Sequence, residues 1–246
     1  MDDVQAINKI EELVKNGMTV EADGRQYTAV NLTPVIFNPK PKTLTVYNLR
    51  GFCQFINNDI DKAIRGKPHL IIVNSYESVD LISAYDEEEK KRTSLISATI
   101  SSELIKYPFG RFFSQEEFAI MFRSLFVKKE NDDFDYVLEY ASKLTGGTQI
   151  DTQDDGITQK VGVKRGVSGA LKGTEELKAI VNLSPYRTFR EIEQPEGEFL
   201  LRVRLDSNEQ PTVALFEADG GAWTIKAMNS IVEFIKKLVT GIEVIA

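Results

Sequence analysis

The sequence predicts an α+β protein, with a mixed N-terminal half whose helices pack on a small sheet, and a β-rich antiparallel C-terminal half closed by a terminal helix. Up to residue 146, segments with apolar residues at helical spacing alternate with short apolar runs. From residue 147, short strand-like runs separated by turn residues dominate until one last amphipathic segment. These patterns predict regions 1–146 and 147–246, which can also form one continuous domain. With 42% apolar and 27% charged residues, the 246-residue chain can bury a sizeable core.

The first part of the chain is predicted to hold a helix, a hairpin and a linker. Apolar residues recur at helical spacing over residues 4–15. Asp23-Gly24 is a turn signal between two strand-like runs. The segment 33–43 contains three prolines, which disfavour both helix and strand pairing, so we expect an extended linker there.

A capped helix and three strands follow. Asn48 can cap a helix that runs to about Ala63, and Cys53 lies on its apolar face, as a buried thiol without catalytic duty. The charged run 86–92 is expected to form a solvated hairpin tip. The strands are expected over residues 69–75, 78–85 and 93–101.

The remaining elements are two helices, five strands and a terminal helix. Ser114 and Glu117 have the spacing of a capping box before a helix with an aromatic face, expected in the core. A second helix is expected from residue 132 or 133 to Leu144. The strands are expected over residues 157–163, 179–183, 186–192, 199–205 and 212–217. The last helix covers about 224–239, and 242–246 can form a final edge strand.

Charge and composition exclude several classes of function. A net charge of -7 gives no bulk attraction to DNA or anionic membranes, so any nucleic-acid contact must be local and basic. A single histidine, His69, precludes a two-histidine metal site, and a single cysteine precludes an intrachain disulfide. The N-terminus lacks the features of a signal peptide, and no apolar run approaches the roughly 18 residues of a membrane span. We expect a cytoplasmic protein without a cofactor.

Five strings in fixed order suggest a family. They are YPFGRFFSQEEF, DDGITQ, PYRTFREIEQP, FLLRVR and ALFEADGGAW. Their joint order resembles the YfdQ-like phage and prophage proteins of unknown function, over about residues 43–238. This resemblance implies a phage or prophage origin and the cytoplasm of a bacterial host. The family has no assigned activity, so the resemblance implies no role for any single residue.

Residues 151–173 combine carboxylates, glycines and cations. Asp151, Gln153, Asp155 and Gly156 match the first positions of a calcium loop, but Gly162 stands where that loop needs glutamate, so a tight turn is the better interpretation. The glycines that follow match no nucleotide-binding fingerprint. Among them, Lys164 and Arg165 would give a basic loop that is able to contact nucleic acid or an acidic protein.

The segment PYRTFREIEQP is the strongest candidate for a binding surface. As a strand it would place Tyr186 and Arg190 on one face, and Arg187 and Phe189 on the other. Guanidinium and aromatic groups together stack on bases, but they also stack on one another. Arg202 and Arg204 share one face of the expected strand 199–205 and would extend the patch. The structural alternative is that these arginines pair with glutamates across strands.

The acidic residues suggest a weaker, catalytic alternative. Glu88-Glu89-Lys90 fits the E-x-K half of a restriction-type nuclease site with Asp80 upstream, but these residues lie in a run of solvated charges. Four carboxylates, if they converged, would be able to hold a metal ion for a nuclease or phosphoesterase. They are Asp154, Asp155, Glu217 and Asp219.

Two functions therefore remain open. The favoured one is a non-enzymatic phage accessory protein that binds nucleic acid or a host protein, in host takeover, defence evasion or recombination. The alternative is the metal-dependent nuclease or phosphoesterase. We also expect a homo-oligomer, because the C-terminal half would expose strand edges.

Overall fold

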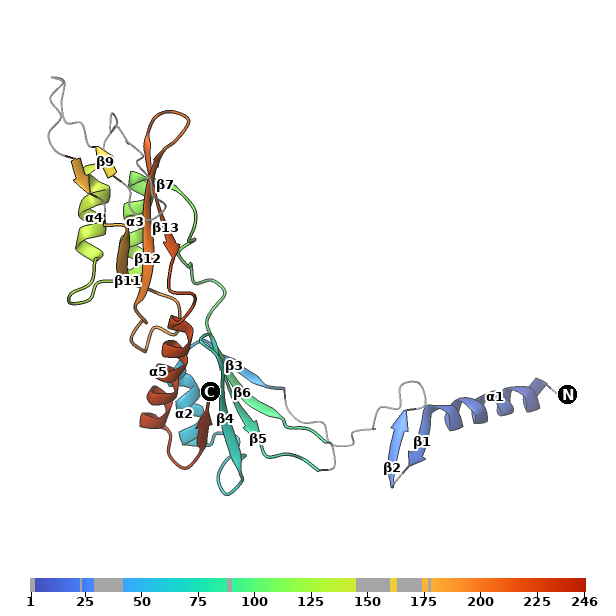
Figure 1. The fold of residues 1–246 in the computed structure, drawn as a ribbon. Helices are drawn as coiled ribbons and strands as arrows, with labels where there is room; N and C mark the ends of the chain where they lie inside the picture. The colour runs from blue at the N-terminus through green and yellow to red at the C-terminus, as the bar shows by residue number, and fades with distance from the viewer. Residues whose placement is uncertain are drawn as a thin grey trace. The chain divides into compact units, whose positions relative to one another are not determined.

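The computed structural model describes residues 3–22, 24–28, 42–87, 90–144, 160–162, 174–176 and 178–246 (Figure 1). The chain divides into two compact units, Met1–Lys42 and Thr43–Ala246. No helix in these ranges is long and apolar enough to cross a membrane.

The first unit contains the predicted helix and hairpin. Helix α1 spans Asp3–Met18, and strands β1 (Thr19–Ala22) and β2 (Arg25–Thr28) pair antiparallel. Gly24 lies between the strands with φ of 72°, a conformation that glycine adopts without steric cost. Residues 33–41 of the expected linker lie outside the described part of the chain, and the unit ends at Lys42.

The second unit contains two five-stranded sheets. In the first sheet the order is β14-β4-β5-β6-β3; the three central strands are antiparallel, and both edge strands pair in parallel. Helices α2 (Leu49–Asn58) and α5 (Trp223–Leu238) pack on it, beside each other (Figure 1). The strands are β3 (Leu44–Val46), β4 (His69–Ser75), β5 (Ser78–Ser83), β6 (Ser94–Thr99) and β14 (Glu243–Ile245).

The second sheet has the order β7-β13-β12-β11-β8 and is antiparallel throughout. Helices α3 (Gln115–Leu125) and α4 (Phe134–Lys143) pack on one of its faces through a shared aromatic core. The strands are β7 (Phe113–Ser114), β8 (Phe126–Val127), β11 (Ile180–Pro185), β12 (Gly197–Leu205) and β13 (Pro211–Glu217). Strands β9 (Lys160–Gly162) and β10 (Thr174–Glu176) form a separate pair.

The α+β class and the terminal helix are confirmed, and the connectivity is richer than the sequence suggested. Helix α5 and strand β14 complete the first sheet, whose other strands come from residues 44–99. The second core combines α3 and α4 with strands β11, β12 and β13. Both cores therefore draw on both sides of residue 146, which itself lies outside the described residues.

Helix α2 ends earlier than predicted. The expected helix ran to about Ala63, but Asp59 takes a left-handed conformation with φ of 46°. Its carboxylate accepts hydrogen bonds from the amides of Ile64 (2.8 Å) and Arg65 (3.1 Å), which holds the chain in a turn. Ile60, which follows Asp59 in this turn, is exposed as a result. Cys53 is buried as expected. Its burial, and to a smaller extent the nearby charge of Glu191, raise its pKa to about 11.

Candidate functional site

The segment 186–192, expected to be a strand, is an irregular loop. The expectation is wrong because the buried side chain of Gln194 takes the place of a neighbouring strand. Its Oε1 accepts from the amides of Arg187 (3.0 Å) and Thr188 (3.3 Å), and its Nε2 donates to the carbonyl of Phe189 (2.9 Å). Thr188 Oγ1 also donates to the carbonyl of Tyr76, which ties the loop to the turn between β4 and β5.

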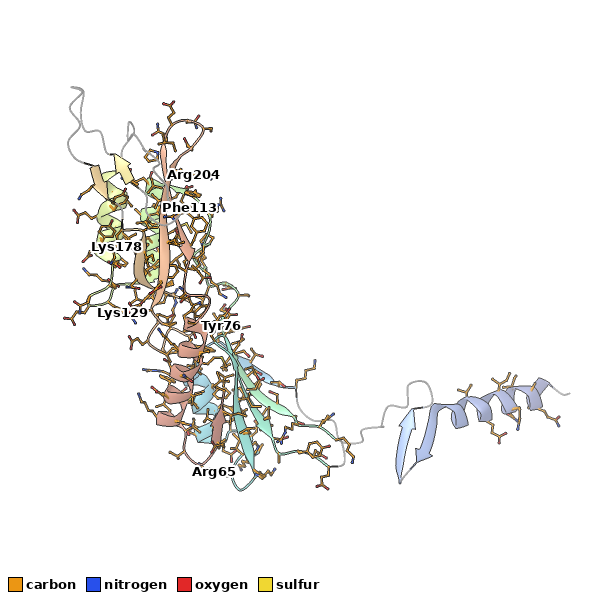
Figure 2. All side chains as sticks on the ribbon, viewed as in Figure 1. Arg65, Tyr76, Phe113, Lys129, Lys178 and Arg204 are labelled. Carbon is orange, nitrogen blue, oxygen red and sulfur yellow. The ribbon has the colours of Figure 1, made fainter. Side chains whose placement is uncertain are left out.

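Arg187 is buried, and so it does not belong to a surface patch as the sequence suggested. Only 5% of the residue is exposed, and three aromatic rings surround its guanidinium group. The Cζ atom lies 4.4 Å from the ring centroid of Trp223, 4.8 Å from that of Phe199 and 5.3 Å from that of Phe109. Tyr76 packs edge-on against Trp223, with centroids 4.6 Å apart, near the start of α5 (Figure 2). Arg187 therefore joins elements of both sheets.

The two described carboxylates of the metal hypothesis flank this arginine. Nη1 of Arg187 lies 3.0 Å from Oε1 of Glu217, an ion pair whose angles do not meet hydrogen-bond geometry. Burial lowers the pKa of Arg187, while Glu217 and Asp219 favour its charged form. A Cβ atom on Gly197 would lie 2.6 Å from Asp219 Oδ2 and 3.2 Å from Arg187 Nη2, so only glycine fits between them. The guanidinium group of Arg187 therefore occupies the position in which a metal ion would bind these two carboxylates.

The other residues of the expected patch lie in different environments. Phe189 is 3% exposed and packs in the core of the first sheet. Arg190 is exposed and stacks on the half-buried Tyr186, with Cζ 4.4 Å from the ring centroid. These two residues and Lys106 line a narrow surface groove. The structure thus divides PYRTFRE between two interior sites and one small surface pair.

Arg202 and Arg204 lie on a different surface, the face of the second sheet that points away from its core. Alternation along β12 directs Phe199, Leu201 and Val203 into the core beneath α3 and α4. The residues between them lie on the opposite face, which we call the outer face. In order along β12 they are Glu198, Leu200, Arg202 and Arg204.

Two phenylalanines on the outer face were missed by the sequence analysis. The Arg204 Cζ atom lies 3.8 Å from the ring centroid of Phe112, and Phe112 packs edge-on against Phe216 at 6.0 Å. Both rings are half-buried. Phe112 directly precedes the core residue Phe113 of the edge strand β7, and Phe216 directly follows the core residue Leu215 of the neighbouring strand β13. Their alternation with buried Phe113 and Leu215 was the available signal.

Charge changes sign along the outer face. At the end of β12 near Gly197 lies an open hollow of about 610 Å³. The charged residues of its lining are acidic except for Lys226 of α5. The complete lining consists of Asn182, Glu196, Gly197, Glu198, Ala218, Asp219, Ala222 and Lys226. The opposite end of β12 carries Arg202 and Arg204 beside the phenylalanine pair. The outer face therefore offers an aromatic, basic end and an acidic end.

Several predicted residues cannot be placed. Lys164, Arg165, Asp154 and Asp155 lie outside the described residues, as do Glu88 and Glu89 of the nuclease half-site. Asp80 accepts hydrogen bonds from Asn74 and Ser97 within the first sheet. Across the part of the chain that the structure describes, no three histidine, cysteine, aspartate or glutamate side chains are grouped as a metal site would require.

Comparisons with known proteins place no constraint on the site. No family model matches the chain, no curated protein matches it, and no solved structure matches its fold.

Proposed function

We propose that this chain is a non-enzymatic binding protein of phage or prophage origin that takes single-stranded nucleic acid on the outer face of its second sheet. The observation that carries the proposal is the stack of Arg204 on Phe112, 3.8 Å from Cζ to ring centroid, with Phe216 beside it. Aromatic rings and guanidinium planes on an open sheet are the groups on which unpaired bases stack, at about 1–3 kcal/mol per base.

The shape of the surface favours single strands over duplexes. A sheet face cannot enter a groove of double-stranded DNA as a helix does, whereas splayed bases can lie flat against it. The chain has a net charge of -7, so attraction to phosphate must come from local cations. Arg204 provides such a cation next to the rings, and Arg202 lies two positions before it on the same face of β12.

The acidic end of the outer face limits the length of single-stranded nucleic acid that this face can hold. Arg204 follows Glu198 by six positions along β12, a distance of about 20 Å at the rise of an extended strand. Phosphates would be repelled near Glu196, Glu198 and Asp219, which line the hollow. We therefore expect a short footprint, confined to the end of the face that carries the arginines and phenylalanines.

The setting of this function follows from the family resemblance. A phage protein that acts in the host cytoplasm and grips short unpaired stretches would serve recombination, host takeover or evasion of host defences. The catalytic alternative loses support, because Glu217 and Asp219 are engaged with Arg187.

Fluorescence anisotropy with labelled poly-pyrimidine DNA and RNA oligonucleotides tests the proposal. The wild type should bind at low salt, with affinity that falls as salt rises. Arg204→Gln should weaken binding about tenfold, because one stacking and one phosphate contact are lost. Phe112→Ala should have a similar effect.

Arg123→Gln provides the matched control. Arg123 is an exposed arginine of α3, which packs on the opposite face of the same sheet, and its replacement changes the net charge equally. This control should bind like the wild type. Equal loss in Arg123→Gln and Arg204→Gln would show bulk electrostatics only, and absence of binding to every oligonucleotide at low salt would favour a host protein as the partner.

A further inference from the structure

Helix α1 carries a stripe of apolar side chains that are exposed among the described residues of the first unit. Val4, Ile7, Ile10 and Val14 are 61%, 59%, 60% and 49% exposed, although each belongs to the same side of the helix. Their spacing of three, three and four residues forms a continuous stripe along α1. All four side chains are β-branched and aliphatic, a type common at the seams of helix bundles.

The first unit is too small to stabilise such a helix alone. It spans Met1–Lys42 and is a compact unit distinct from the unit Thr43–Ala246. Domains near 40 residues usually need a metal, a disulfide or association with another chain. Isolated helices of this length are marginal in water, so most of their stability must come from packing of the apolar face. The unit has no cysteine for a disulfide.

The polar side of α1 indicates which partner fits. Lys9 pairs with Glu12 within the helix at 3.3 Å, and the three acidic residues of α1 (Asp3, Glu11 and Glu12) against two lysines (Lys9 and Lys15) give it a net charge of only -1. A helix that lies on an anionic membrane carries mainly lysine and arginine on its polar side and aromatic residues or leucine on the other. The near-neutral flanks of α1 allow two copies to approach without strong repulsion, and identical aliphatic stripes complement one another.

We propose that α1 associates with α1 of a second copy of this chain through Val4, Ile7, Ile10 and Val14. This inference is independent of the proposed nucleic-acid function. It also locates self-association away from the second sheet, whose edges are the two-residue strands β7 and β8, too short to template pairing with another sheet.

Sedimentation velocity of the full chain over a range of concentrations tests the proposal. The wild type should sediment as a multiple of the 27.7 kDa chain. The double variant Ile7→Glu/Ile10→Glu should sediment as a single chain, because two charges would be buried without partners in each copy. Its thermal unfolding should retain the main transition, since both cores lie in the second unit.

Ile120→Glu is the matched control. Ile120 is 60% exposed on α3, as Ile10 is on α1, and the variant should remain associated. A wild type that sediments as one chain at the highest soluble concentration would overturn the proposal, as would a double variant that stays associated. Flotation of a monomeric wild type with phosphatidylglycerol vesicles would assign the stripe to a membrane instead.

Discussion

At the scale of single residues, the most unusual feature is a cation placed in the interior. Arg187 reaches the rings of Phe109, Phe199 and Trp223 and meets Glu217, whose side chain is 43% exposed. Because Glu217 remains in contact with water, the ion pair is partly screened and contributes little by itself. We infer that stacking on the three rings is the larger contribution of this side chain.

Arg187→Lys should lower the free energy of unfolding by about 2–3 kcal/mol, because an ammonium group keeps the charge buried but cannot lie flat between rings. Arg187→Met should cost less, since a flexible thioether packs against aromatic rings and buries no charge. Urea denaturation of the two variants checks this order. A methionine variant less stable than the lysine variant would show that the ion pair, and not the stacking, dominates.

At the scale of elements, the loop 186–195 shows where local sequence patterns fail. Tyr186–Ile192 has the alternation of a strand, yet its amides bond to the side chain of Gln194. The burial of this loop does not follow that alternation, because Arg187, Thr188 and Phe189 are all buried, and Arg187 and Phe189 enter different environments. Alternation in the sequence therefore identified neither which of these side chains turn inward nor what receives their backbone.

Gln194→Leu should lower the free energy of unfolding by about 2–4 kcal/mol, because it leaves the amides of Arg187 and Thr188 buried without acceptors. Gln115→Leu is a suitable comparison, since Gln115 Nε2 makes one exposed hydrogen bond, to the carbonyl of Ser142. Thermal unfolding monitored by circular dichroism distinguishes them. Equal stability of the two variants would mean that water replaces the Gln194 contacts.

Other elements were predictable because their signals are local. The Ser114–Glu117 capping box, the Asn48 cap and the alternating strand β12 all form as their sequences indicate. The candidate site was only half predictable, because one half of it depends on local signals and the other half on contacts between residues that are distant in the sequence. Alternation places Arg202 and Arg204 on one face, but Phe112 reaches them only because β7 pairs with β13, about 100 residues away in the chain.

At the scale of the whole molecule, the order of the elements along the chain differs from the order in which they are arranged in the two sheets. Helix α5 and β14 complete the first sheet after the chain has built the second. Arg187 and Thr188 connect the second sheet to Tyr76 and Trp223, so the loop that contains them is a structural joint. Arg187 and Phe189, which the sequence favoured for binding, are therefore part of the fold, and we propose the outer face as the binding surface.

Photo-crosslinking can locate nucleic acid on the outer face, where we propose that it binds. Oligonucleotides that contain 5-iodouridine, irradiated with the wild-type protein and mapped by mass spectrometry, should crosslink to aromatic residues Phe112 and Phe216. Crosslinks confined to Tyr186, beside Arg190, or to residues of α3 and α4 would contradict the claim.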